Sequence, residues 1–170
     1  MRAFIGCALS CLLGVAEPAT VFAEDQPAAK PALPELPAPP DVGGPPADGK
    51  RTKSGLVTKI LVPGAGKAKP TRGCEVKVRY AGWMTDGKLF DTSEKKGAGF
   101  VAQFPIDFLI EGWQEGLKMM LVGEKRRMWI PANLAYGDTP RRPGGPHGLL
   151  VFDVELVDIV SAKSTDKPKK

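Results

Sequence analysis

The chain has 170 residues, of which 42% are hydrophobic and 25% are charged. This length suits one ordinary globular domain with terminal extensions and leaves no room for a second domain of usual size. The formal net charge is +5, but residues 56–162 carry fifteen basic and twelve acidic side chains, and the last eight residues carry four lysines against one aspartate. Because the basic residues form no stripe, the charge argues against a nucleic-acid partner.

Residues 1–23 have the features of a signal peptide. Arg2 precedes an apolar run over residues 3–16, and Val21-Phe22-Ala23 satisfies the small-residue rule for cleavage. The apolar run is too short to cross a bilayer. We therefore expect an exported protein, periplasmic or secreted, without a membrane span after cleavage. Lipid attachment at Cys11 is a less favoured alternative, because this residue comes early and lacks the usual aliphatic residue three places upstream.

The segment that follows is rich in proline. Residues 24–55 contain eight of the seventeen prolines and few large apolar side chains. Such a composition buries too little apolar surface to offset the entropy of ordering. We therefore predict a disordered linker over residues 24–53, a folded domain over 54–160, and a disordered lysine-rich tail over 161–170.

Five segments of the predicted domain have the pattern of β-strands. In the second of them, Val76, Val78 and Tyr80 alternate with basic residues, which is the period of a half-buried strand. Asp86-Gly87 then predicts a hairpin turn. The basic cluster 125–127 lies in the fourth strand, where alternation would divide it between two faces, and we interpret it as solvated surface. The five predicted strands are residues 56–62, 76–80, 88–93, 124–130 and 149–157.

One stretch, residues 108–120, predicts an amphipathic helix. Leu109, Trp113, Leu117 and Met120 recur at steps of three or four residues, while polar side chains occupy the other side. Two glycines at 112 and 116 each cost about 1 kcal/mol relative to alanine in a helix, so their presence indicates neighbours that approach closely. The expected fold class is α+β, with an antiparallel sheet of about five strands wrapped around one short helix.

The residues of ordinary catalytic and metal sites are sparse. His147 is the only histidine, and a dyad with Cys74 would lack a third group to orient it. Paired cysteines and paired histidines are absent from the sequence of the predicted domain, so a zinc site is not expected. Glu111 and Glu115 lie four residues apart on the polar face of the helix, where solvation is the plain interpretation. The sequence therefore predicts neither a metal nor a cofactor.

Five ordered motifs between residues 54 and 160 resemble the FKBP-type peptidyl-prolyl cis-trans isomerases. Any one of them alone would be a weaker match than their order along the chain. The motifs are Val78-Arg-Tyr-Ala-Gly82, Asp86-Gly-Lys-Leu-Phe-Asp-Thr-Ser93, Ile110-Glu-Gly-Trp-Gln-Glu-Gly116, Ala135-Tyr-Gly137 and Leu150-Val-Phe-Asp-Val-Glu-Leu156.

This resemblance implies a shallow apolar pocket between helix and sheet that receives the proline ring of a peptide. The catalytic groups it implies are the Asp91 carboxylate, the Tyr136 hydroxyl and the backbone N–H of Ile110. Trp113, which the pattern alone favours as a core residue, would form the pocket floor. The remaining substrate-binding positions it implies are Tyr80, Phe90, Phe100, Leu109 and Phe152.

The activity implied is isomerisation of Xaa-Pro bonds during the folding of exported proteins. The alternative is a chaperone or adaptor module that binds proline-containing segments with little turnover. Macrolides of the immunosuppressant type are a second implied ligand class, and a monomer is expected. The chain departs from the family at Ala102, where a second pocket aromatic is often found, and in its short loop 138–147. That loop carries Arg141 and Arg142 in place of a covering aliphatic pair, so we expect a more open, more positive rim and weaker macrolide binding.

Overall fold

The computed structural model describes residues 33–160. The predicted signal peptide, the first part of the predicted linker and the predicted tail lie outside the described residues. Within residues 33–160, no helix combines the length and apolar character needed to cross a bilayer.

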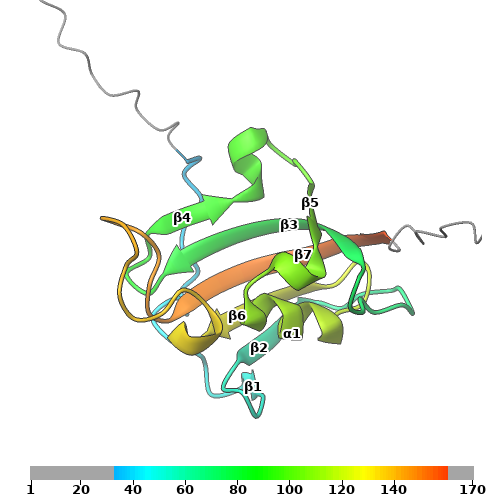
Figure 1. The fold of residues 1–170 in the computed structure, drawn as a ribbon, viewed down its shortest axis with the longest axis horizontal. Coiled ribbons are helices and arrows are strands. Elements are labelled where there is room, and N and C mark those ends of the chain that lie inside the picture. Colours follow the sequence, from blue (N-terminus) through cyan, green and yellow to red (C-terminus); the bar gives the residue numbers. More distant parts are fainter. Residues whose placement is uncertain (1–32, 161–170) are drawn as a thin grey trace, which may run out of the picture. The chain divides into compact units, whose positions relative to one another are not determined.

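The described residues form one antiparallel sheet and a short helix, which confirms the α+β prediction (Figure 1). The strand order is β1-β2-β6-β7-β3-β4, and β5 pairs with β3. Two short strands, β1 and β5, were not predicted, because β1 has two polar residues in the proline-rich segment and β5 ends in a proline. The strands are β1 (Lys50–Arg51), β2 (Val57–Val62), β3 (Glu75–Met84), β4 (Leu89–Thr92), β5 (Ala102–Pro105), β6 (Lys125–Ile130) and β7 (Leu150–Val160).

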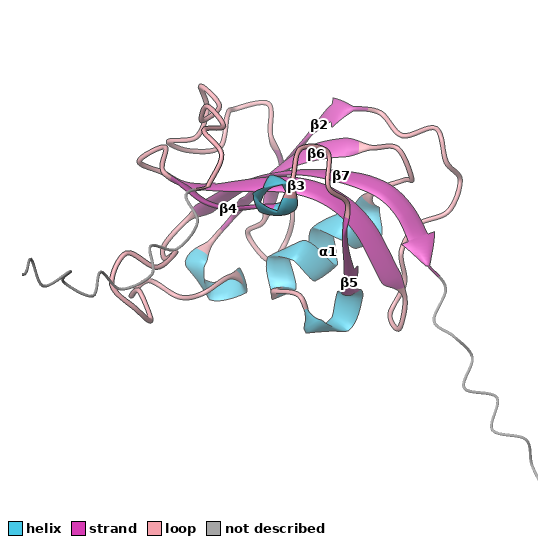
Figure 2. Cartoon of the chain, turned by 90° about the horizontal axis from the view of Figure 1, so that it is seen from above, coloured by secondary structure: helices cyan, strands magenta, loops and turns pink. Residues whose placement is uncertain are grey.

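The helix α1 (Glu111–Met119) lies along one face of the sheet (Figure 2). It is shorter than predicted, because Ile106–Phe108 form a separate 3-10 turn, and Ile110 is the cap residue in extended conformation. The two glycines are where the helix approaches β6: a Cβ at Gly112 would overlap Ile130, and one at Gly116 would overlap the sulfur of Met128. The close approach predicted from these glycines is therefore confirmed. Two further 3-10 turns, Ser93–Lys96 and Ala132–Leu134, complete the elements.

The other face of the sheet carries a row of apolar side chains across four strands. Val57, Trp129, Val151 and Trp83 are successive cross-strand neighbours in β2, β6, β7 and β3. All four are almost completely buried. Since α1 covers the opposite face, something else must cover this row.

The cover is the segment 33–49, which we call the N-terminal strap (Figure 1, blue to cyan). The indole N–H of Trp83 donates to the carbonyl of Leu36 at 3.3 Å, and that of Trp129 donates to the carbonyl of Asp41 at 3.0 Å. Val42 packs against the cluster around Trp129. An extended proline-rich backbone leaves its carbonyl groups free to accept hydrogen bonds such as these. A count of the apolar side chains in the sequence does not reveal those hydrogen bonds.

The strap corrects one prediction. Residues 33–53 are not a disordered linker, since they cover the back of the sheet and supply β1. The structure therefore extends the packed region about twenty residues before residue 54, to residue 33.

The basic cluster in β6 also differs from its interpretation as solvated surface. Alternation does divide it between two faces, but Arg126 is 6% exposed on the helix side, where its Nε lies 2.6 Å from a carboxylate oxygen of the equally buried Glu124. On the strap side, Arg127 binds both carboxylate oxygens of Asp153, at 2.6 and 2.7 Å, and also pairs with Asp41. Both guanidinium groups therefore belong to the packed structure.

Candidate active site

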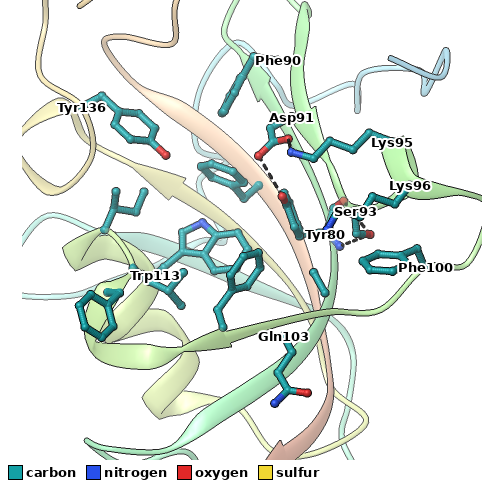
Figure 3. Close-up of a pocket in the computed structure, with 16 residues that line it drawn as sticks. Tyr80, Phe90, Asp91, Ser93, Lys95, Lys96, Phe100, Gln103, Trp113 and Tyr136 are labelled. Atoms are coloured by element: carbon teal, nitrogen blue, oxygen red, sulfur yellow. Dashed lines mark hydrogen bonds and ion pairs between the residues drawn. The ribbon is translucent and has the colours of Figure 1, made fainter. Parts of the chain in front are cut away.

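A pocket of about 430 Å³ opens between α1 and the strands β3, β4 and β5 (Figure 3). Its volume lies within the usual range for small-ligand sites. All nine residues proposed from the sequence resemblance line it, drawn from six separate parts of the chain: Tyr80, Phe90, Asp91, Phe100, Leu109, Ile110, Trp113, Tyr136 and Phe152.

The apolar part of the pocket is a set of aromatic rings that meet edge to face. The ring centroid of Trp113 lies 5.2 Å from that of Tyr80 and 5.3 Å from that of Phe152, with interplanar angles of 84° and 89°. Phe90 meets Phe152 at 5.3 Å and 86°. A Cβ at Gly82 would overlap Phe152 and press on Phe90, so only glycine admits this contact. Such pairs hold the rings rigid and give a dry surface shaped before any ligand arrives.

Asp91 is held by three donors at one side of the pocket. Its carboxylate accepts from the Tyr80 hydroxyl at 2.9 Å, from the Lys95 ammonium at 2.6 Å and from the backbone N–H of Thr92 at 3.0 Å. Burial, and then the negative charge of Asp91, raise the pKa of Tyr80 well above its ordinary value. Tyr80 therefore remains a neutral donor that is committed to Asp91.

Two other donors belong to residues that line the pocket, and they have no acceptor in the described part of the chain. Within residues 33–160, neither the Tyr136 hydroxyl nor the backbone N–H of Ile110 donates a hydrogen bond to another residue. Ile110 is the residue before α1, where backbone N–H groups have no helical acceptor. Burial and the charge of Asp91 raise the pKa of Tyr136, so its hydroxyl also stays protonated. The site thus presents two neutral donors beside an apolar floor.

Several lining residues were not found from the sequence, including Lys95, Lys96, Phe104 and Phe108. Phe104 comes from β5, one of the two strands that the sequence did not predict, and its ring centroid lies 6.1 Å from that of Tyr80. Alternation of Ala102 with Phe104 was the available signal. Ala102 itself lines the pocket at the position of the departure from the family.

The loop 138–147 contributes no side chain to the lining. It is closed by a hydrogen bond from the Gly148 N–H to the Gly137 carbonyl at 2.9 Å. Nδ1 of His147 lies 2.9 Å from the Gly145 carbonyl within the same loop, and Cys74 is not among the lining residues either. In residues 33–160, acidic, histidine and cysteine side chains form no cluster of three or more that could hold a metal ion.

Comparison with known proteins gives a consistent family. The model for "FKBP-type peptidyl-prolyl cis-trans isomerase" matches residues 66–157. An FKBP-type peptidyl-prolyl cis-trans isomerase FkpA of Aeromonas hydrophila is 42% identical over 122 residues, which cover 71% of this chain and 44% of that protein. FK506-binding protein 2 of Debaryomyces hansenii is 41% identical over 101 residues, covering 59% and 75%. This chain therefore spans less than half the length of the FkpA relative.

Solved structures agree with the sequence relatives. The crystal structure of FkpA from Escherichia coli has a TM-score of 0.62 at 38% identity, covering 69% of this chain and 54% of that one. A peptidyl-prolyl cis-trans isomerase from Pseudomonas syringae has a TM-score of 0.60 at 33% identity, covering 68% and 84%. With the motifs, the fold and the aromatic pocket in agreement, this chain belongs to the FKBP-type peptidyl-prolyl cis-trans isomerase family.

Proposed function

We propose that the chain accelerates cis-trans isomerisation of Xaa-Pro bonds in polypeptides. The observation that carries this proposal is the pairing of a rigid aromatic floor with two neutral donors that have no acceptor within residues 33–160. Amide rotation meets a barrier of roughly 18–20 kcal/mol because twisting breaks resonance, and it requires no nucleophile, metal or cofactor. A site that favours the twisted amide is sufficient.

The geometry supports a division of roles. The proline ring would rest on Trp113 while the carbonyl before it rotates. The Ile110 N–H and the Tyr136 hydroxyl would then donate to carbonyl groups of the substrate, most strongly near the twisted geometry. Asp91 would act by its charge and by holding Tyr80, since its carboxylate is already occupied by three donors.

A peptide isomerisation assay tests the proposal. We expect Tyr136→Phe and Asp91→Ala each to lower kcat/KM by about 3- to 30-fold, because each removes one contribution of the size of a hydrogen bond. Folding should be verified by circular dichroism. A protein that binds proline peptides but does not speed isomerisation would support the alternative, a binding module with little turnover. Complete loss of activity in a folded Tyr136→Phe variant would contradict the shared role.

The proposal also predicts a nearly flat pH profile. A raised tyrosine pKa extends the neutral, donating form to higher pH, so the Tyr136 hydroxyl is lost only above the ordinary phenol range near 10. We expect kcat/KM to vary little from pH 6 to 8.5, and His147→Ala to keep near wild-type activity. A bell-shaped profile inside that window would show that proton transfer takes part.

We further propose that the protein is exported and acts as a monomer on other exported chains. The pattern of residues 1–23 supports export, and comparing the full-length protein with its mature N-terminus by mass spectrometry would test it. Support for a monomer is that the exposed large apolar residues in 33–160 are few, namely Ile60, Val62, Phe100 and Phe108. Macrolides of the immunosuppressant type are proposed as weak competitors, to be tested by inhibition of isomerisation.

A further inference from the structure

The rim of the pocket carries two lysines in different situations. Lys95 is paired with Asp91, so its charge is largely neutralised. Lys96 instead stands over the ring of Phe100, with its ammonium 5.1 Å from the ring centroid. Within residues 33–160, no carboxylate forms an ion pair with Lys96. The ring therefore holds an unneutralised cation at the mouth of the pocket.

The loop after Tyr136 adds positive charge on a second side. Arg141 and Arg142 follow Tyr136 by five and six residues, on a loop whose base is closed between Gly137 and Gly148. Neither arginine has an ion-pair partner in the described part of the chain. Their charges lower the pKa of Tyr136, against the larger effects of burial and Asp91, so their field reaches the site. Asp138 carries one negative charge on the same loop, which offsets one of the two positive charges in the loop's net charge.

Few negative charges oppose these cations. Asp91 is the one carboxylate among the residues that line the pocket, and it is matched by Lys95. Glu94 lies on the same 3-10 turn as the lysines, but it lines a separate hollow with Leu36 and Pro37 of the strap. The pocket lining thus has a net charge of +1, and the loop adds a further +1.

Resting on the proposed function, we propose that this site selects proline segments with aspartate or glutamate next to the proline. Lys96 lines the pocket beside Phe100, and the two arginines lie on the loop that follows the lining residue Tyr136, so both groups would attract an acidic side chain of a bound segment. Because none of these three side chains is among the donors proposed for the twisting amide, they act on capture of the substrate. The preference should therefore appear in KM more than in kcat.

The test uses one peptide in three forms, with glutamate, glutamine or lysine at the two residues on either side of the proline. In low salt we expect kcat/KM to fall from the glutamate to the lysine form by about tenfold, since each exposed cation contributes up to about fivefold. The ratio should approach one near 1 M salt, where screening acts over about 3 Å. Equal kcat/KM for the glutamate and lysine peptides in low salt would overturn the inference.

Variants of the intact protein locate the effect. Lys96→Gln, and separately Arg141→Gln with Arg142→Gln, should each reduce the glutamate-to-lysine ratio by about two- to fivefold. Lys50→Gln is the matched control, since it removes an exposed positive charge that also has no ion-pair partner in the described residues, from β1 at the end of the strand order away from β3 and β4. It should leave the ratio unchanged. A ratio that falls equally in Lys50→Gln would show that the effect is one of net charge and would contradict the assignment to the rim.

The two proposals fail in different ways. If the neutral peptide is isomerised but charge makes no difference, the substrate preference is wrong and the enzymatic function stands. If no peptide is isomerised, the function is wrong. Dissociation constants of the three peptides, followed by tryptophan fluorescence, then test the charge preference alone: tighter binding of the glutamate form supports it, and equal binding overturns it.

Discussion

Removing the N-terminal strap should lower the free energy of unfolding by about 2–4 kcal/mol, although the strap lies on the face of the sheet away from the pocket. A chain shortened to residues 50–170 keeps β1 but loses the acceptors for Trp83 and Trp129 and exposes the apolar row around Trp129. For a domain of this size the loss corresponds to a melting temperature lower by roughly 10 °C. Thermal and urea unfolding would measure both.

Two shorter changes separate the strap from the rest of the N-terminus. A chain of residues 33–170 retains every strap contact described above, and we expect its stability to match that of a chain beginning at residue 24. Val42→Ala should lower stability by about 1 kcal/mol through lost packing. If the 50–170 chain were as stable as the 33–170 chain, the strap would cover the sheet without stabilising the fold, which would contradict this prediction.

Glu124→Ala should destabilise the protein by about 3–5 kcal/mol, because it leaves the guanidinium of Arg126 buried without its counter-ion. The two side chains are 4% and 7% exposed. Glu124 also accepts the backbone N–H of Leu121 at 3.1 Å, and Arg126 reaches the Thr58 hydroxyl at 3.5 Å. The substitution therefore leaves several polar groups without their hydrogen-bond partner at once. Urea unfolding gives the change directly.

Glu155→Ala is the matched control, since it breaks a carboxylate–arginine pair of similar length at the surface. The partner is Arg79, with an Nη1 to Oε1 distance of 3.0 Å and both side chains more than a third exposed. We expect a loss below about 1 kcal/mol. Glu124→Gln combined with Arg126→Met should recover much of the stability lost in Glu124→Ala, because it removes the buried charge and keeps an acceptor for Leu121. Equal losses for Glu124→Ala and Glu155→Ala would contradict the buried-pair account.

The order of the motifs along the chain predicts some residues of the candidate site and misses others. Nine lining residues could be named because seven of them belong to local motifs whose order along the chain matches the family, and the matched motifs also fix the positions of Phe100 and Leu109 between them. Lys95 and Lys96 were missed, although they follow Asp91 closely, because nothing local distinguishes a lysine at a pocket mouth from one in solvent. Phe104 was missed with β5, since a four-residue strand ending in proline has too short an alternation to be recognised.

The sequence by itself determined the elements whose pattern is local and repeated. Alternation specified the long strands, the two helix glycines indicated the close approach to Ile130 and Met128, and five ordered motifs specified the family. Tertiary structure alone decided which basic side chains of β6 are buried, because alternation assigns a face but not what covers it. It also decided that the proline-rich strap is ordered. That order depends on backbone carbonyls meeting the indole groups of Trp83 and Trp129, 47 and 88 residues away in sequence, and composition carries no information about such contacts.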